Sequence, residues 1–288
     1  MDEIQNNQIS RPAPEDEKRS GLRILSDRLK FVVGVGAYVT LIIEVAKTTL
    51  QKPPAPSLIL KQLFDIGVAS LLVVSITGFS TGLVLAAQSF YQLSDKGLAS
   101  VTGLLVAKAM ITELGPVLTG FMVTGRVGAA MCAELGTMKV TEQVDALQTM
   151  AVNPNRYLLA PRFIAGIFMI PLLTIFSMFM GIYGGYLISI YFFNMAPTTY
   201  FDPMPTHITL FDFTTGIVKS FFFGCLIMTI SCYKGMTTTG GAEGVGKSTT
   251  QSVVYTYCWI LLSNFFLTMG LNLARMQLAR MFPVLGYD

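Results

Sequence analysis

Five long segments with almost no charged side chains dominate this sequence of 288 residues. They are 66–90, 117–133, 163–193, 217–233 and 253–273. A helix needs about 20 apolar residues to cross the roughly 30 Å of hydrocarbon in a bilayer, and most of the segments reach that length. Charged residues make up 13% of the chain, against about 25% in soluble domains. The sequence therefore predicts an all-α polytopic membrane protein with five transmembrane helices.

A shorter apolar segment, 31–45, precedes these five and has basic residues on both sides. It is too short to cross a membrane easily, and Lys and Arg concentrate on the cytoplasmic side. We therefore expect an N-terminal interfacial helix with both flanks, and the N-terminus, in the cytoplasm. The first 30 residues mix charges of both signs without an apolar core, which argues against a signal peptide.

The pattern of charges and prolines divides the chain into four parts. We expect a polar disordered tail at 1–20, and the interfacial helix with a Pro-rich linker at 21–62. A transmembrane domain should follow at 63–275, and a C-terminal tail at 276–288. Basic residues in the connection 136–161 place it in the cytoplasm, whereas the connection 194–213 has no Lys or Arg and should lie outside.

The stretch Gly241–Ser248, GAEGVGKS, matches the phosphate-binding pattern of nucleotide-binding proteins. A working phosphate loop follows a buried strand, however, and here an apolar membrane segment precedes it. We interpret the stretch as a Gly-rich turn between two membrane helices, with Ser248 or Thr249 capping the last one. The match does not predict nucleotide binding.

The second apolar segment is bordered by two Glu-Leu-Gly tripeptides, at Glu113 and Glu134. A continuous helix between them spans about 31 Å and places both carboxylates on the same side. Arg126 lies between them, where a lone charge is costly, so it should pair with a carboxylate or a carbonyl or line a wet cavity. A structural ion pair and a polar cavity both remain open for Arg126 and Glu113.

Small residues recur every fourth position in the first two segments. Such rows let a neighbouring helix approach closely, within a bundle or a dimer. The candidate helix-packing residues are Gly78, Gly82, Gly120 and Gly128.

A short amphipathic helix should follow Glu134, with Thr141 as its N-cap and its end at Asn153-Pro154. It is either an ordinary surface helix or a coupling helix that inserts into a cytoplasmic motor. The candidate coupling residues are Glu134, Glu142, Asp145, Leu147 and Met150.

Four motifs in this region resemble those of the MlaE-type family of ABC transporter permeases. They are ELGPV at 113, GRVGAAMCAELGTM at 125, TEQVDAL at 141 and AVNP at 151. The similarity extends from about residue 20 to 275. It implies an inner-membrane permease subunit with an interfacial helix and five spans, which works as a homodimer and moves phospholipid or another hydrophobic molecule between the inner and outer membranes.

The resemblance also implies partners. A separate cytoplasmic ATPase would use ATP, so this chain would bind no cofactor and would not itself be an enzyme, and an MCE-domain protein would carry the lipid. Glu113 or Arg126 would meet the lipid headgroup, and the helix around residues 142–150 would contact the ATPase. Relatives often have a basic residue where this chain has Thr112, which weakens any headgroup contact inferred there.

The residues leave a rival function open, a gradient-driven secondary transporter or channel that uses Glu113 and Arg126. A third alternative is a membrane anchor without transport. The single histidine and the four cysteines, which have no C-x-x-C pair, predict no metal site. The net charge of +3 follows from cytoplasmic Lys and Arg and requires no nucleic-acid partner.

Overall fold

The computed structural model describes residues 36, 38–41, 43–45, 47–49 and 53–281, and every regular element in these residues is a helix. The expected tail at 1–20, the first part of the expected interfacial segment and residues 282–288 lie outside the described residues. The described residues between 36 and 49 are helical. The residues from Glu44 onward form one compact unit.

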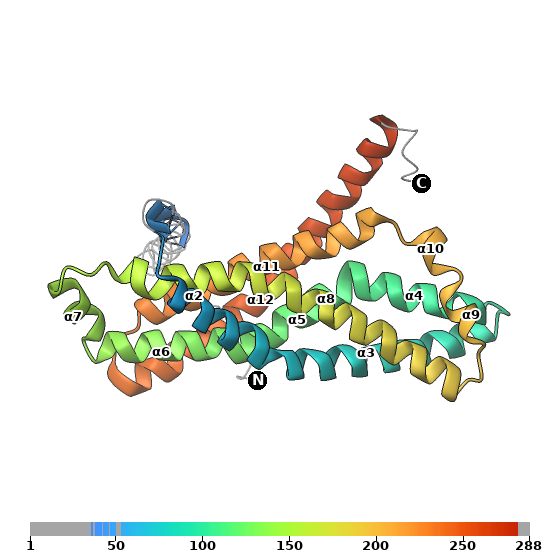
Figure 1. The fold of residues 1–288 in the computed structure, drawn as a ribbon, viewed down its shortest axis with the longest axis horizontal. Coiled ribbons are helices and arrows are strands. Elements are labelled where there is room, and N and C mark those ends of the chain that lie inside the picture. Colours follow the sequence, from blue (N-terminus) through green and yellow to red (C-terminus); the bar gives the residue numbers. More distant parts are fainter. Residues whose placement is uncertain (1–35, 37, 42, 46, 50–52, 282–288) are drawn as a thin grey trace, which may run out of the picture. The chain divides into compact units, whose positions relative to one another are not determined.

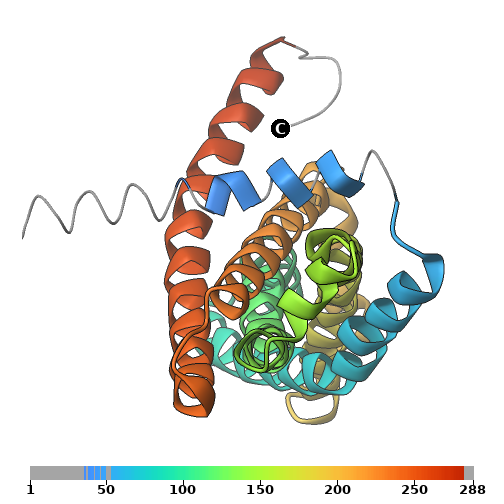
Figure 2. The same cartoon turned by 90° about the vertical axis from the view of Figure 1, so that its left-hand side faces the viewer.

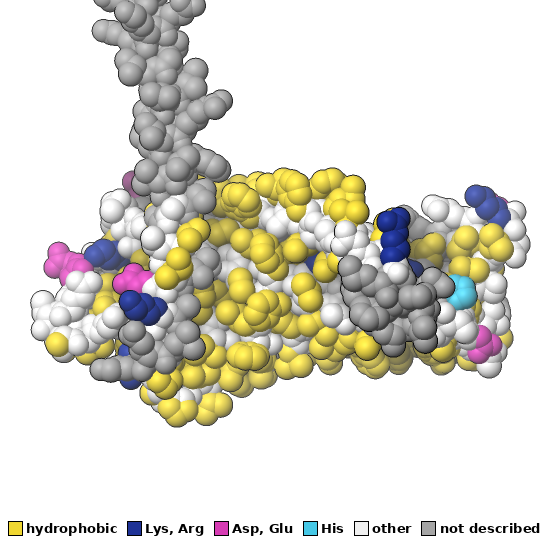
Figure 3. Space-filling model, turned by 90° about the horizontal axis from the view of Figure 1, so that it is seen from above, with side chains coloured by type: hydrophobic (Ala, Val, Ile, Leu, Met, Phe, Trp, Pro, Cys, Tyr) yellow, Lys and Arg dark blue, Asp and Glu magenta, His cyan; other side chains and the backbone are white. Residues whose placement is uncertain are grey.

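Five helices in this unit are long and apolar enough to cross a membrane, which confirms the predicted fold class (Figure 1). The five are Pro56–Ser94, Ala99–Val140, Asn155–Tyr191, Leu210–Met236 and Gly241–Gln277. Exposed apolar side chains cover the middle of the face in Figure 3, and charged side chains gather toward its two ends. This distribution matches a bundle surrounded by hydrocarbon at its waist and by water at its ends.

The first span begins ten residues before the apolar run, at Pro56, because proline suits the first helical position. Its three parts form one continuous helix that ends at Ser94. They are α2 (Pro56–Leu63), the π-helical turn η1 (Phe64–Val68) and α3 (Ala69–Ser94).

The second span is also continuous and contains two π-helical turns, η3 and η4. Its parts are η2 (Ala99–Val101), α4 (Thr102–Ala109), η3 (Met110–Leu114), α5 (Gly115–Val123), η4 (Thr124–Gly128) and α6 (Ala129–Val140). A π-helical turn holds more residues than an α-helical one, so it rotates all later side chains about the axis. Glu113 consequently contacts the fourth and fifth spans, whereas Glu134 contacts the third, and the predicted common side is not observed.

The remaining elements complete the bundle. They are α7 (Gln143–Thr149), η5 (Asn155–Leu159), α8 (Ala160–Tyr191), α9 (Pro197–Phe201), α10 (Met204–His207), α11 (Leu210–Met236) and α12 (Gly241–Met281). The N-cap of α7 is Glu142 in a left-handed conformation and not Thr141. The Thr141 hydroxyl instead donates to the Thr137 carbonyl at the end of α6, so it is not free to cap α7.

The stretch Gly241–Ser248 forms the first two turns of α12 and is not a loop. The connection is shorter than predicted and ends at Gly240 and Gly241, which both have positive φ angles. Glycine adopts this conformation without steric cost. Ser248 and Thr249 lie inside the helix, where the Thr249 hydroxyl donates to the Val245 carbonyl, so neither caps it. With no preceding strand, this geometry does not form a phosphate loop.

The most extensive helix packing among the described elements joins α3 to α8, which cross through small residues. A Cβ atom on Gly78 would lie 2.7 Å from the Ser177 carbonyl oxygen, and one on Gly82 would overlap the Gly181 carbonyl. The Gly78 and Gly82 row therefore packs against α8 of the same chain.

The glycines of the second span pack against other helices. A Cβ atom on Gly128 would lie 2.9 Å from the Ser231 hydroxyl on α11, and one on Gly120 would lie 3.3 Å from the Ile260 side chain on α12. Small residues in the first two spans thus bring helices together inside this bundle.

Helix α12 is the least buried of the five, with 11% of its most apolar window buried. It lies along one side of the bundle, in contact with α6 and α11 (Figure 2). Many of its exposed side chains are large and apolar, and they include Trp259, Phe265, Phe266 and Met269. This surface is available to lipid or to another protein chain.

Candidate functional site

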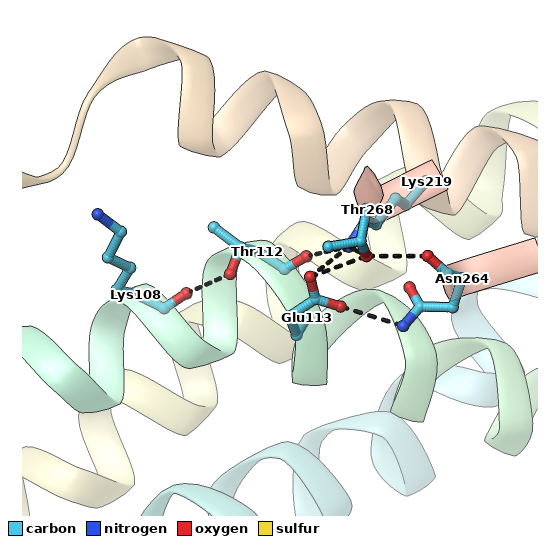
Figure 4. A network of polar contacts seen from close by, with 6 residues as sticks. All are labelled: Lys108, Thr112, Glu113, Lys219, Asn264 and Thr268. Carbon is cyan, nitrogen blue, oxygen red and sulfur yellow. Dashed lines mark hydrogen bonds and ion pairs between the residues drawn. The ribbon is translucent and has the colours of Figure 1, made fainter. Parts of the chain in front are cut away.

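A polar cluster lies among the apolar spans, where η3, α11 and α12 meet (Figure 4). We define the Glu113 cluster as Thr112, Glu113, Lys219, Asn264 and Thr268. It contains the first of the two charged residues that the sequence marked as substrate-cavity candidates. The second, Arg126, has no hydrogen bond or ion pair with this cluster in the described part of the chain.

Lys219 is the centre of the Glu113 cluster, and its side chain is completely buried. Its ammonium nitrogen lies 2.6 Å from Glu113 Oε1, 2.7 Å from the Thr268 hydroxyl and 3.0 Å from the Thr112 carbonyl oxygen. An ammonium group has three N–H donors and no acceptor. All three donors are therefore used, and the buried charge is both paired and hydrogen-bonded.

The Glu113 carboxylate is held from three directions but stays partly open, with 37% of its side chain exposed. Oε2 accepts a hydrogen bond of 3.1 Å from the Asn264 amide, and Oε1 lies 3.0 Å from the Thr268 hydroxyl. The Asn264 carbonyl oxygen Oδ1 is buried and has no partner among the described residues. The cluster thus exposes acceptor oxygens of Glu113 while it buries the cation.

The local sequence explains why a carbonyl of η3 is free to bind Lys219. In an ordinary α-helix the Thr112 carbonyl would accept from the backbone nitrogen of residue 116. That residue is Pro116, which has no N–H. The Thr112 carbonyl accepts from Lys219 instead. The Glu-Leu-Gly-Pro motif thus supplies the carboxylate of the site, and its proline leaves the preceding carbonyl free.

Lys219, Asn264 and Thr268 are not among the site residues predicted from the sequence. Lys219 lies within the apolar segment 217–233, and a lone charge there is the same signal that identified Arg126. Asn264 and Thr268 are four residues apart on α12 and thus on one helix face. Their uncharged side chains carry a weaker signal.

Arg126 lies in η4 and is exposed on the surface of the bundle. Its guanidinium donates to the Ser70 hydroxyl at 2.7 Å and to the Asp65 carbonyl at 3.4 Å. Of the alternatives for its partner, the structure shows a carbonyl and a hydroxyl; no carboxylate within the described ranges forms an ion pair with it. Both bonds use Nη1, so the other donors of this exposed guanidinium have no hydrogen-bond partner among the described residues.

The other predicted residues lie at the far end of the second span. The Glu134 carboxylate lies 2.8 Å from the guanidinium of Arg162, whose side chain is 4% exposed. Asp145 pairs with Lys139 at 2.9 Å on the surface. This end therefore carries one buried cation and one exposed ion pair.

Helix α7 presents most of its side chains outward. Only Val144 is buried in it, while Leu147 is half-buried, Glu142 is exposed and Met150 is 64% exposed. The predicted apolar face is thus partly free, which leaves Met150 available to a partner. Among the described residues no group of three His, Cys, Asp or Glu side chains could hold a metal ion.

Comparison with known proteins places this arrangement in a family. The Permease MlaE family matches residues 59–270. A probable ABC transporter permease of Rickettsia typhi is 43% identical over 241 residues, which cover 83% of this chain and 93% of the relative. The matched region contains all five spans except the first three residues of the first span and the last seven of the fifth.

Two further relatives have names that describe a function or a location. The intermembrane phospholipid transport system permease MlaE of Haemophilus influenzae is 35% identical over 73% of this chain and 81% of its own length. The chloroplastic protein TRIGALACTOSYLDIACYLGLYCEROL 1 of Arabidopsis thaliana is 37% identical over 73% of this chain and 60% of its own length. The predicted resemblance is confirmed: this chain belongs to the MlaE family of ABC transporter permeases.

Proposed function

We propose that this permease subunit moves phospholipid or a related hydrophobic molecule between the inner and outer membranes of a bacterium. The Glu113 cluster carries the proposal, because it holds a half-open carboxylate among apolar spans where charges are expensive. A lipid path needs apolar walls for the tails and a few polar groups for the headgroup. The name of the Haemophilus influenzae relative supports the same substrate class.

Glu113 and Arg126 would serve the headgroup at successive positions and not at one site. The two residues are 13 positions apart, about 20 Å along a helix, so one headgroup cannot touch both. At Glu113 the exposed atoms are acceptor oxygens, which suit the ammonium or hydroxyl of a headgroup. At Arg126 the exposed atoms are donors, which suit its phosphate.

The driving force would come from a separate ABC ATPase that uses ATP in the cytoplasm, while this chain binds no cofactor. The exposed residues Glu142, Asp145 and Met150, together with Leu147 and Glu134, would form its contact on the α7 end. An MCE-domain protein would exchange lipid at the opposite end. The exposed apolar surface of α12 would face a second copy in a homodimer or the surrounding lipid.

We assign the α7 end to the cytoplasm, together with the N-terminus, in the inner membrane. Lys61, Lys139, Arg156, Arg162, Lys234 and Lys247 lie at this end. Lys96, Lys108, Arg275 and Arg280 lie at the opposite end, where Arg275 pairs with Asp212, which caps α11 through Thr209. The excess of basic residues near α7 follows the positive-inside rule.

The test is to purify the tagged full-length protein in mild detergent and identify the proteins that accompany it by mass spectrometry. An ATPase and an MCE-domain protein should be recovered. The reconstituted complex should then transfer a fluorescent phospholipid between vesicles only when ATP is present. Transfer by this chain alone, driven by an ion gradient, would support the rival secondary transporter or channel instead.

Two pairs of variants test the headgroup contacts. Glu113→Gln and Arg126→Gln should reduce ATP-dependent lipid transfer at least tenfold. The matched controls are Glu243→Gln and Lys247→Gln, because these side chains are exposed on the first turns of α12 and have no hydrogen bond or ion pair to another described residue. Normal transfer by a well-folded Glu113→Gln or Arg126→Gln variant would remove that residue from the path.

A further inference from the structure

A groove separate from the Glu113 cluster lies where the first and third spans begin. It has a volume of about 560 Å³, within the range of small-molecule sites, and its walls include Thr48, Leu58, Val152, Asn153, Arg156 and Tyr157. The first span begins at Pro56 and the third at Asn155. The groove therefore lies at one end of the bundle, close to the headgroup layer of the membrane.

The charged side chains near this groove indicate where it lies relative to the membrane. Lys61 and Asp65 follow it on the first helix, and Arg162 follows it on the third, before each helix becomes purely apolar. Tyr157 is exposed beside it, and tyrosine is enriched at the membrane interface. The groove consequently lies at the boundary between water and hydrocarbon, whichever side of the membrane this end faces.

Arg156 supplies the groove with positive charge that no carboxylate of the described residues neutralises. Its guanidinium donates one hydrogen bond, of 3.2 Å, to the Pro53 carbonyl. Within the described ranges no carboxylate forms an ion pair with it. A guanidinium has five N–H donors, so several remain for a ligand, and their planar arrangement matches the oxygens of a phosphate.

Asn153 adds further donors to the same wall. Its side-chain oxygen accepts a hydrogen bond of 2.9 Å from the Asn155 backbone nitrogen, which fixes the side chain at the start of the third span. This bond uses the oxygen and leaves the amide N–H groups of Asn153 without a partner among the described residues. The polar side of the groove thus offers donors from two residues, which is the chemistry that binds an anion.

Much of the remaining wall of the groove is apolar. It is formed by Pro54, Ala55, Leu58 and Val152. A free phosphate ion would gain nothing from these surfaces, whereas the glycerol and upper acyl chains of a lipid would bury them. We propose that this groove binds the phosphate headgroup of an anionic phospholipid, outside the transport path.

The site is tested by native mass spectrometry on the purified full-length protein after delipidation. Dioleoylphosphatidylglycerol is added as the anionic probe, and dioleoylphosphatidylcholine as the zwitterionic one. Wild-type protein should retain one more phosphatidylglycerol per chain than Arg156→Gln. The apparent affinity for that lipid should fall about fivefold, as expected for the loss of one basic residue near a membrane surface.

Matched variants separate this site from other lipid contacts. Lys247→Gln removes an exposed cation at the same end and should leave the lipid count unchanged. Arg156→Lys keeps the charge but not the planar fork, so it should retain an intermediate affinity.

Three results would overturn the proposal. One is an equal phosphatidylglycerol count for wild type and Arg156→Gln, both well folded by their thermal unfolding. Another is displacement of the bound lipid by millimolar inorganic phosphate, which would show a site for a free anion. The last is an unchanged lipid count with reduced recovery of the ATPase in Arg156→Gln, which would assign the groove to a protein interface.

Discussion

The second span carries an ion pair toward each of its ends, and the two pairs share one design. In each, the cation is buried and the carboxylate is the more exposed partner: Lys219 with Glu113, and Arg162 with Glu134. They differ in how the cation is satisfied. Lys219 has three acceptors, whereas the Nη1 atom of Arg162 is buried without a partner among the described residues.

This difference predicts how strongly each buried cation depends on its carboxylate for the stability of the fold. A buried lysine that loses its counter-charge can release a proton and keep its hydrogen bonds, but an arginine remains charged in proteins. The Arg162 pair should therefore depend more strongly on Glu134 for stability. The Glu113 carboxylate, whose side chain is 37% exposed against 60% for Glu134, can therefore be engaged by a ligand at a lower cost to the fold.

The largest effect is expected for Glu134→Gln. It leaves the charge of Arg162 buried and uncompensated, which should lower the free energy of unfolding by about 3 kcal/mol. Thermal unfolding of the purified protein in detergent measures the loss. The double variant Arg162→Met/Glu134→Gln should recover most of it, because no buried charge remains. A double variant no more stable than Glu134→Gln would contradict this explanation.

Glu113→Gln should destabilise the protein less, by about 1.5 kcal/mol, because Lys219 keeps its bonds to Thr112 and Thr268 after it loses its proton. The same unfolding measurement compares the two variants directly. A loss as large as that of Glu134→Gln would break the distinction between the two pairs. Lipid transfer by Glu113→Gln should nevertheless fall sharply, since the exposed carboxylate is lost.

Glu142→Gly should stabilise the protein by about 1 kcal/mol, because Glu142 begins α7 with a φ angle of 61°. The gain is measured as a higher unfolding temperature. The greater freedom of glycine in the unfolded chain reduces this gain in stability. The matched control is therefore Gln143→Gly, which places glycine inside the helix and should destabilise the protein. A Glu142→Gly variant less stable than wild type would show that the Glu142 carboxylate stabilises the protein by more than the left-handed backbone conformation destabilises it.

The smallest change in stability is expected for Asp145→Asn. Asp145 and Lys139 are both substantially exposed, and such pairs contribute below about 1 kcal/mol. The unfolding temperature should hardly move. If α7 contacts the ATPase as proposed, ATP hydrolysis by the assembled complex should still change. Unchanged hydrolysis and lipid transfer would make the Lys139–Asp145 pair an ordinary surface contact.

Several features were predictable because they depend only on residue type along the chain. Segment length and apolar content predict the five spans, since hydrocarbon thickness sets a minimum helix length. Arg126 was recognised because a charge in an apolar segment is conspicuous. Lys219 carried the same signal and was missed, while Asn264 and Thr268 have uncharged side chains that any membrane helix tolerates.

Other features depend on how the helices meet in space. The expected common side for Glu113 and Glu134 assumed a regular helix, and the π-helical turns rotate later residues away from it. The N-cap of α7 is Glu142 and not the predicted Thr141, because the Thr141 hydroxyl donates to a carbonyl of α6. Likewise, GAEGVGKS became helix because it continues into the last span, a choice that local pattern does not specify.

The sequence by itself determined the class of protein, the number of spans and the family, because the hydrophobic effect and the family motifs act through residue identity. Only the tertiary structure decided which carboxylate meets which cation. Lys219 is 106 residues from Glu113, and Asn264 is 151 residues away. Their association depends on the rotation and crossing of three helices, and these are set by packing among small residues far apart in the chain.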